Sequence, residues 1–477
     1  MTHDSLCFLT ATKLAAMIRT RQVSCREVMR AHLAQIERVN PAVNAMVTQV
    51  PEQALAKAKA ADAAIARGEL WGPLHGLPVA HKDLMPTRGI RTTFGSPIYR
   101  DFVPDEDGLL VQRLHAAGAI TVGKTNTPEF GAGSQTFNAV FGATRNPYDL
   151  SKTCGGSSGG AAVALACGMV PLADGSDLGG SLRNPASFCN VVGLRPSMGR
   201  VPHWPALNTF NTLSMVGPMA RTVKDVALMT SVIAGPDPRA PLSLSEPGSL
   251  FKQPLARAFK GVKVAWSADF NGLAVDPRVI ATLAPQRAVL KALECEVEEA
   301  CPDFRDADEI FQVLRAKSFE ASYGALLTEH RHQMKQTVIW NIEQGQALTG
   351  AQVGRAENLR TALYHRVRAF MEEYEYLVLP VAQVPPFDVE QEYITEINGH
   401  KMGTYIDWMR SCFYISVTGC PAISVPCGFT ADGLPVGMQI VGRPRQDFAV
   451  LQLAHAFEER RPCWRQRPSV AEPKPQP

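Results

Sequence analysis

Two glycine-serine loops separated by one apolar segment constrain this chain more than any other feature. The first loop is TCGGSSGG at residues 153–160, and the second is GSDLGGSLR at residues 175–183. Glycine adopts backbone conformations that other residues avoid and lets other groups approach the backbone closely. We therefore expect Ser157 and Ser181 to present unobstructed hydroxyl groups. Residues 161–167 are mostly strong helix formers, which predicts a helix supporting the first loop.

The first loop taken alone is compatible with several interpretations. Each loop can be no more than a tight turn. A phosphate-binding P-loop is excluded, because it ends in Gly-Lys-Ser/Thr and this loop does not. Residues 155–159 match Gly-x-Ser-x-Gly, the nucleophile elbow of α/β-hydrolases. That interpretation makes Ser157 the nucleophile and requires a downstream acid and histidine, for which His455 is a candidate.

Further motifs accompany the two loops in a fixed order. They are VAHKDL (79–84), GKTNTPEF (123–130), GATRNP (142–147), NPASFCNVVGL (184–194), GPMAR (217–221), GCPAISVPCG (419–428) and GLPVGMQ (433–439). With them the sequence resembles the amidase signature family of serine hydrolases over residues 65–460. Departures are small: Ser176 stands where the family often has threonine, and Leu182 where it often has isoleucine.

The resemblance implies an amidohydrolase that cleaves the carbon–nitrogen bond of a small or medium-sized amide through an acyl-enzyme. The products are a carboxylate and an amine or ammonia. The implied triad consists of Ser181 as nucleophile, Ser157 as the serine on a cis peptide bond, and Lys82 as base. No metal and no organic cofactor is implied.

The resemblance also assigns roles to neighbouring residues. The implied oxyanion hole is formed by the backbone N–H groups of Leu178, Gly179, Gly180 and Ser181. The implied supporting residues are Ser176, Asp177 and Arg183. The segment implied to line the substrate pocket is Phe130, Gly131, Ala132 and Gly133. Three small residues there suggest room beside the nucleophile, although a turn with no substrate role is the alternative.

Lys82 must be uncharged to act as a base, because an ammonium group accepts no proton. Free lysine titrates near about 10.4, and burial disfavours its charged form. We therefore expect a buried Lys82 at the end of a strand over residues 77–82. Without the resemblance, a solvated lysine or an ion pair with Asp83 is the plainer interpretation. Because strand side chains alternate, His81 is expected to point to the opposite face.

Composition narrows the class of protein further. The 477 residues are 45% hydrophobic and carry a formal charge of +3, so nothing favours nucleic acid or an anionic membrane as a partner. Asp4 interrupts any signal-peptide core, and no run of 18 apolar residues predicts a membrane helix. The 11 scattered cysteines lack C-x-x-C, which favours free thiols in the cytoplasm. Cys154 is not needed as a nucleophile.

Strand–helix–strand order over residues 77–124 predicts an α/β fold. The family resemblance implies a large mixed, mostly parallel twisted sheet covered by helices on both faces. The predicted divisions are an N-terminal helical arm (1–68), a catalytic domain (69–467) and a disordered tail (468–477). A variable helical insertion (303–375) is expected to shape specificity within that domain. Ser24 begins a capping box, and Asn40-Pro41 is expected to end the helix that follows.

Rival functions remain open at this point. A component resembling the A subunit of a glutamine amidotransferase would release ammonia for tRNA amidation and would need partner chains. A binding protein with a decayed site is disfavoured because Lys82, Ser157 and Ser181 are all present. His330 and His332 face apart on a helix, which disfavours a metal site. The natural amide, ester or carbamate and the oligomeric state, including a homodimer, are not determined by the sequence.

Overall fold

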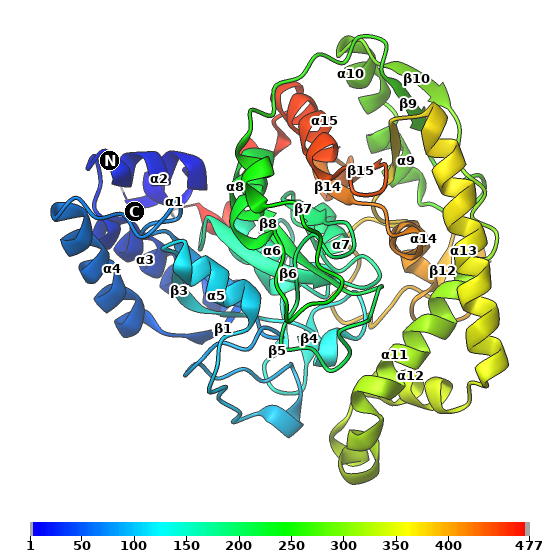
Figure 1. The fold of residues 1–477 in the computed structure, drawn as a ribbon, viewed down its shortest axis with the longest axis horizontal. Helices are drawn as coiled ribbons and strands as arrows, with labels where there is room; N and C mark the ends of the chain where they lie inside the picture. Colours follow the sequence, from blue (N-terminus) through cyan, green and yellow to red (C-terminus); the bar gives the residue numbers. More distant parts are fainter. Residues whose placement is uncertain (1–2, 473–477) are drawn as a thin grey trace.

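The computed structural model describes residues 3–472, and its centre is a twisted 11-stranded sheet (Figure 1). In spatial order the strands are β1 (Met46–Gln49), β3 (Ile120–Thr125), β2 (Pro78–Lys82), β6 (Leu172–Asp177), β8 (Met215–Ala220), β7 (Val192–Arg195), β14 (Ala422–Phe429), β15 (Pro435–Gly442), β11 (Tyr376–Pro380), β9 (Lys263–Trp266) and β10 (Glu296–Glu299). Two small hairpins pair β4 (Phe137–Asn138) with β5 (Gly142–Ala143) and β12 (Glu396–Ile397) with β13 (His400–Lys401).

Helices cover this sheet and account for most of the remaining regular structure. They are α1 (His3–Cys7), α2 (Ala11–Arg19), α3 (Cys25–Val43), α4 (Pro51–Ala66), α5 (Leu109–Ala116), α6 (Gly159–Ala166), α7 (Arg183–Phe188), α8 (Val223–Ile233), α9 (Pro277–Leu283), α10 (Gln286–Ala292), α11 (Ala307–His330), α12 (Gln336–Gln346), α13 (Gly350–Glu373), α14 (Arg410–Thr418) and α15 (Asp447–Arg460). The predicted mixed α/β architecture is thereby confirmed.

The expectation of a mostly parallel sheet is wrong. Parallel pairing occurs toward the two ends of the sheet, between β2 and each of β3 and β6, and between β9 and each of β10 and β11. The centre, from β6 through β8, β7, β14 and β15 to β11, is antiparallel. The strand–helix–strand unit predicted from the sequence, β2–α5–β3, is parallel. The parallel pairing of this one unit does not determine how the other strands of the sheet pair.

Helices lie on both faces of the sheet, as two glycines of β15 demonstrate. A Cβ atom built on Gly437 would point at Ser187 of α7, 2.9 Å away. A Cβ atom on Gly442 would instead point at Val450 of α15, 2.4 Å away. Residues of opposite parity on a strand face opposite sides. Helices α7 and α15 therefore sandwich β15.

The two serine loops end beside one another because of this arrangement. Strands β2 and β6 are parallel neighbours, with Val79 opposite Leu172, so their carboxyl ends meet at one edge. The first loop leads into α6, a helix that is buried all round. A Cβ atom on Gly160 would lie 2.3 Å from the Asn126 backbone nitrogen, so only glycine permits this contact between α6 and the end of β3.

The N-terminal arm is helical with one addition and one correction. Ser24 and Glu27 form the predicted capping box on α3. That helix does not end at Asn40-Pro41 but runs through Pro41 to Val43, since Asn44 in the left-handed region closes the final turn. The arm also contributes strand β1, which pairs with β3 in the main sheet and was not predicted. The boundary at residue 68 stays a prediction.

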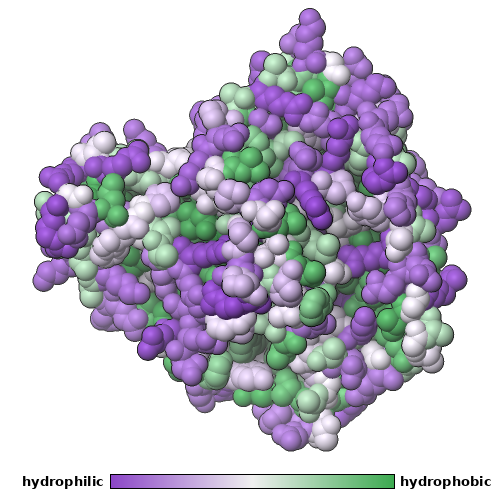
Figure 2. Space-filling view, viewed as in Figure 1, coloured by the Kyte–Doolittle hydropathy of each residue, from purple (hydrophilic) through white to green (hydrophobic). Residues whose placement is uncertain are grey.

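The segment 303–375 is helical as predicted. Helices α11 and α12 are drawn in yellow-green at the lower right of Figure 1, and the yellow α13 runs along the right side. On the face shown in Figure 2, hydrophobic residues form small separate groups among hydrophilic ones. No described helix is both long and apolar enough to cross a membrane.

The expected disorder of residues 468–477 is wrong for its first part, whereas 473–477 lie outside the described residues. Residues 469–471 form a short 3-10 helix in which Ala471 is fully buried. The Ala471 carbonyl accepts hydrogen bonds from Gln35 and Arg38 of α3, at 3.3 and 2.7 Å. Burial and these bonds order a segment whose composition alone suggested disorder.

Truncation after Arg467 is therefore expected to destabilise the protein. It uncovers α3 and removes acceptors from Gln35 and Arg38, so the free energy of unfolding should fall by about 1–3 kcal/mol. Denaturant unfolding measures the change, with truncation after Glu472 as the control that keeps these contacts. Equal stability of the two truncated chains would contradict the docking of this segment.

Candidate active site

A fully buried lysine lies at the centre of the two serine loops. Lys82 is the last residue of β2, and its Nζ lies 2.7 Å from the Ser157 hydroxyl. The same nitrogen lies 3.0 Å from the hydroxyls of Ser158 and Ser176. Three neutral hydroxyls therefore surround the amine, and no carboxylate forms an ion pair with it among residues 3–472. Sequence reasoning missed Ser158, although it is adjacent to Ser157.

Burial changes the protonation of this lysine. Removal from water lowers the pKa of Lys82 to about 7, although the negative charges of Asp177 and Asp174 act in the opposite direction. A charged amine in a dry pocket loses its hydration, and hydroxyl partners replace only part of it. Near neutral pH a substantial fraction of Lys82 is therefore uncharged and able to accept a proton.

The two serine loops are joined directly. The Gly156–Ser157 peptide bond is cis, in agreement with the expectation. The Ser158 N–H donates to the Ser181 carbonyl at 3.2 Å. Ser181 itself is partly exposed, and its hydroxyl makes no hydrogen bond within the described part of the chain. The structure thus shows the Lys82–Ser157 contact but no hydrogen bond between Ser157 and Ser181.

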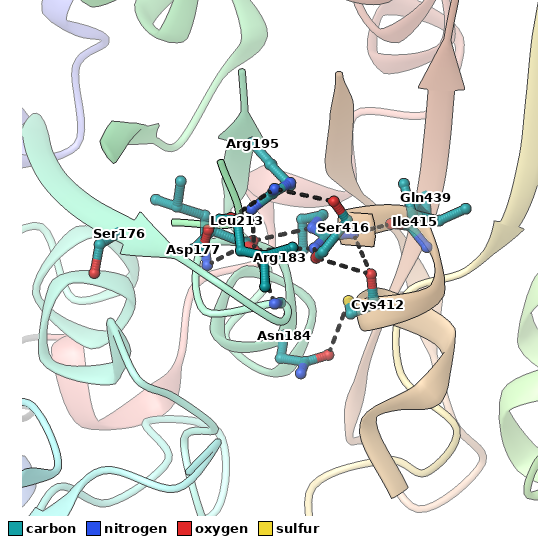
Figure 3. Close-up of polar contacts among 12 residues, drawn as sticks. Ser176, Asp177, Arg183, Asn184, Arg195, Leu213, Cys412, Ile415, Ser416 and Gln439 are labelled. Carbon is teal, nitrogen blue, oxygen red and sulfur yellow. Dashed lines mark hydrogen bonds and ion pairs between the residues drawn. The ribbon is translucent and has the colours of Figure 1, made fainter. Parts of the chain in front are cut away.

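Asp177 anchors the second loop through buried ion pairs, drawn in Figure 3. Its carboxylate accepts from Nε and Nη2 of Arg183, both at 3.0 Å, and lies 3.1 Å from Nη1 of Arg195. Burial by itself raises the pKa of Asp177, but the two guanidinium groups outweigh it and hold the pKa well below its usual range. Arg183 also donates to the Ser416 hydroxyl and to Gln439, which fixes the loop to α14 and β15.

One expected oxyanion donor is already engaged. The Gly180 N–H donates to Asp177 at 2.8 Å, whereas the assignment of the four N–H groups to an oxyanion hole stays a prediction. The N–H groups of Leu178, Gly179 and Ser181 have no acceptor among the described residues. Asp177 orders the loop by taking Gly180, and three donors remain for a ligand.

The segment of residues 130–133 lies against the first loop. A Cβ atom on Gly131 would be 3.4 Å from the Ser157 hydroxyl, and its φ of +72° further restricts the position to glycine. Phe130 stacks on Tyr323 of α11 with ring centroids 4.4 Å apart. Ala132 is fully buried. Gly131 therefore faces the site, whereas Phe130 packs into an aromatic cluster beside it.

A second polar network holds the backbone of Lys82 and the side chain of His81. Sequence reasoning missed most of this network. Asp174 accepts the Lys82 backbone N–H at 2.9 Å and pairs with His81 Nδ1 at 2.5 Å. His81 Nε2 contacts the Thr121 hydroxyl at 2.9 Å, which also contacts His115. The His81 and Lys82 side chains have different hydrogen-bond partners, as expected from alternating side chains. The aspartate lies 92 positions from Lys82 and gave no local signal.

Ser134 provides another missed connection. Its hydroxyl donates to the Gly156 carbonyl at 2.7 Å and accepts from the Asn184 amide at 3.0 Å. It therefore ties the cis-peptide loop to the helix that follows Ser181. The signal was a serine directly after the glycine-rich segment, one position beyond the residues implied to line the pocket.

The rival nucleophile arrangements do not fit this geometry. Among residues 3–472, no histidine hydrogen-bonds Ser157 or Ser181, and His455 instead pairs with Glu459 at 3.2 Å. Burial raises the pKa of the Cys154 thiol to about 12, which keeps it protonated at neutral pH. At this site a buried amine, and no imidazole, contacts the Ser157 hydroxyl.

Comparison with known proteins identifies the family. The family model described as Amidase matches residues 27–451. An acylamidase of Rhodococcus erythropolis is 36% identical over 98% of this chain and 99% of its own. The A subunit of the glutamyl-tRNA(Gln) amidotransferase of Synechococcus sp. (strain CC9605) is 35% identical over 97% and 98%. The crystal structure of a bacterial aryl acylamidase superposes with a TM-score of 0.90 at 28% identity, over 98% and 99%.

The chain belongs to the amidase signature family. It is a hydrolase of amide carbon–nitrogen bonds, with the large mixed sheet and covering helices of that family.

The ion pairs of Asp177 generate a stability prediction. Asp177→Asn leaves two buried guanidinium groups without their carboxylate, so we expect a loss of about 3–5 kcal/mol in the free energy of unfolding. The matched control is Glu343→Gln, which breaks an exposed pair with Arg331 and should cost below about 1 kcal/mol. Urea unfolding of both variants measures the difference, and equal losses would contradict the anchoring role of Asp177.

Proposed function

We propose that this amidase works through an acyl-enzyme on Ser181, with Ser157 and Lys82 as its proton relay. The observation that carries the proposal is the buried Lys82 amine, 2.7 Å from the Ser157 hydroxyl and with a pKa lowered to about 7. Amides are poor electrophiles and serine is a poor nucleophile, so a base must remove the serine proton during attack. An uncharged Lys82 meets that need.

The proposed steps begin at the Lys82–Ser157 contact. Lys82 Nζ takes the Ser157 proton while Ser157 takes the Ser181 proton. Ser181 Oγ then bonds to the amide carbon, whose oxygen becomes negatively charged. The N–H groups of Leu178, Gly179 and Ser181 stabilise that oxyanion, and each such donor is typically worth about 10²–10³ in rate.

Collapse of this intermediate completes the reaction. Ser157 returns a proton to the amide nitrogen, the carbon–nitrogen bond breaks, and the amine or ammonia leaves. A water molecule gives up its proton through the same relay and attacks the acyl carbon. The carboxylate departs, and Ser181 regains its proton.

The proposed substrate is a small or medium-sized amide. Gly131 adds no side chain beside Ser157, which leaves space for an acyl or amine group there. The likeness to the acylamidase and the aryl acylamidase supports simple acylated amines as substrates. We keep Gly131, Ala132 and Gly133 as one wall of the pocket, with Phe130 behind it.

A second candidate is an ammonia-releasing component of an amidotransferase. The 35% identity to the A subunit of a glutamyl-tRNA(Gln) amidotransferase over nearly the whole chain favours it. Such a component would need partner chains. Rapid hydrolysis of simple amides by the isolated chain would argue for the first candidate.

A cytoplasmic location is also proposed, supported by the lack of any disulfide among the cysteines of residues 3–472. We also propose a homodimer, which sedimentation equilibrium can test.

The nucleophile assignment predicts a labelling result. Ser181→Ala should abolish covalent labelling by a fluorophosphonate, because the oxygen that attacks is removed. Intact-mass spectrometry measures the adduct. Cys154→Ala is the control and should label like the unmodified protein, since that thiol is buried and protonated. An adduct on Ser181→Ala at another serine would contradict the assignment.

The lowered pKa of Lys82 predicts the pH dependence. Only the uncharged amine is reactive, so kcat/KM for a slow amide should rise with pH along a limb centred near 7 and level off above it. Asp174→Asn removes a charge that raises the pKa of Lys82, so this limb should move to lower pH. Lys82→Arg should be inactive throughout, because arginine stays protonated. A profile that is flat from about pH 6 to 9 would exclude Lys82 as the base.

A further inference from the structure

A buried arginine without an acidic partner lies beside the candidate active site. Arg315 of α11 is only 4% exposed. Its Nε donates to the Asn341 side-chain oxygen at 3.0 Å, and its Nη2 donates to the Tyr405 hydroxyl. Both acceptors are neutral. No carboxylate lies within ion-pair distance of Arg315 in the described part of the chain.

The other deeply buried arginines of this protein are compensated differently. Arg183 and Arg195 share the Asp177 carboxylate, and Arg200 pairs with Asp447 at 3.1 Å. Arg221 donates to three backbone carbonyls. Burying a guanidinium is costly unless it is paired and hydrogen-bonded. Among these buried arginines of residues 3–472, Arg221 and Arg315 have no ion pair, and Arg315 has only two neutral side-chain acceptors.

Aromatic faces surround the Arg315 guanidinium but leave part of it free. Its central carbon lies 4.6 Å from the ring centre of Phe319, 5.6 Å from that of Tyr405 and 5.9 Å from that of Phe311. Nη1 donates no hydrogen bond to any described residue. It is also not one of the solvent-inaccessible polar atoms without a partner, so it keeps some solvent-accessible surface. A planar donor edge is therefore held rigidly and still reaches accessible space.

Two of the aromatic rings that pack on this guanidinium also contact the candidate active site. Phe311 abuts the oxyanion loop, because a Cβ atom on Gly179 would lie 2.6 Å from its ring. Tyr405 abuts the pocket wall, because a Cβ atom on Gly133 would lie 3.8 Å from its ring. Arg315 packs on both aromatic rings. One aromatic ring therefore separates the guanidinium from the oxyanion loop, and another separates it from Gly133.

We propose that Arg315 binds a carboxylate of the substrate, so that the amide cleaved by this enzyme is an acidic one. The planar guanidinium edge matches a carboxylate through two parallel N–H···O bonds, and a low-dielectric site strengthens them. Asn341 and Tyr405 hold the guanidinium in place without neutralising its charge. This inference rests on the proposed function, because it names the substrate class of the same site.

The test compares amides that differ only in a carboxylate. The p-nitroanilide of succinic acid is paired with that of 4-oxopentanoic acid, in which a methyl ketone replaces the carboxylate on the acyl side. On the amine side, 4-acetamidobenzoate is paired with 4-acetamidoacetophenone. We expect kcat/KM of the unmodified enzyme to favour the acidic member at least about tenfold in one pair. No preference for the acid in either pair overturns the proposal.

Variants at Arg315 test whether this residue carries the preference. Arg315→Gln should lower the acid-to-neutral ratio of kcat/KM at least about tenfold, and Arg315→Lys should keep part of the ratio. The matched control is Arg355→Gln, which should leave the ratio unchanged. Arg355 is exposed, and it pairs with Glu309 of α11, the helix that carries Arg315. An unchanged ratio in Arg315→Gln would show that Arg315 is structural.

A measurement on the unmodified protein does not depend on the folding of any variant. Succinate should slow fluorophosphonate labelling of Ser181 in a saturable manner, whereas butane-1,4-diol should not. One outcome overturns the carboxylate site and leaves the proposed function intact. In that outcome succinate does not slow the labelling, and the acidic and neutral amides of each pair are hydrolysed equally fast. Absence of labelling and of hydrolysis would instead contradict the proposed function itself.

Discussion

The enclosure of Lys82 in a pocket of hydroxyl groups is the constraint on which the rest of the site depends. A lysine amine loses its proton near neutral pH only where water is excluded and no carboxylate pairs with it. Parallel strands β2 and β6 bring Lys82 and Ser176 to one edge of the sheet, and the first loop closes over them. Helix α6 can approach closely enough to seal this edge because its first turn carries glycine.

The negative charges near Lys82 are placed so that they do not pair with it. The Asp177 carboxylate is taken by Arg183, Arg195 and the loop backbone, while Asp174 is taken by His81 and the Lys82 backbone N–H. Both aspartates still raise the pKa of Lys82 at a distance, which moderates the effect of burial. Ordering of the second loop and protonation of the base are therefore coupled through the same carboxylate.

Local signals predicted much of the fold. The capping box at Ser24 and the strand ending at Lys82 appear in the structure because each depends on neighbouring residues. Strand β1 and the docking of Ala471 on α3 were missed because both depend on partners far away in the chain. Pro41 did not end its helix, since the loss of one N–H near the last turn is tolerated when Asn44 closes it.

The sequence by itself determined which reactive groups are present: the Lys82 amine, two serines on glycine-rich backbones, and a family pattern that assigns them roles. Only the tertiary structure decided their state. Burial set the protonation of Lys82, Asp177 took the Gly180 N–H, and the packing of α11, α12 and Tyr405 left Arg315 without a carboxylate. The physical reason is that dielectric environment and hydrogen-bond partners come mostly from residues far apart in the chain, which no local pattern records.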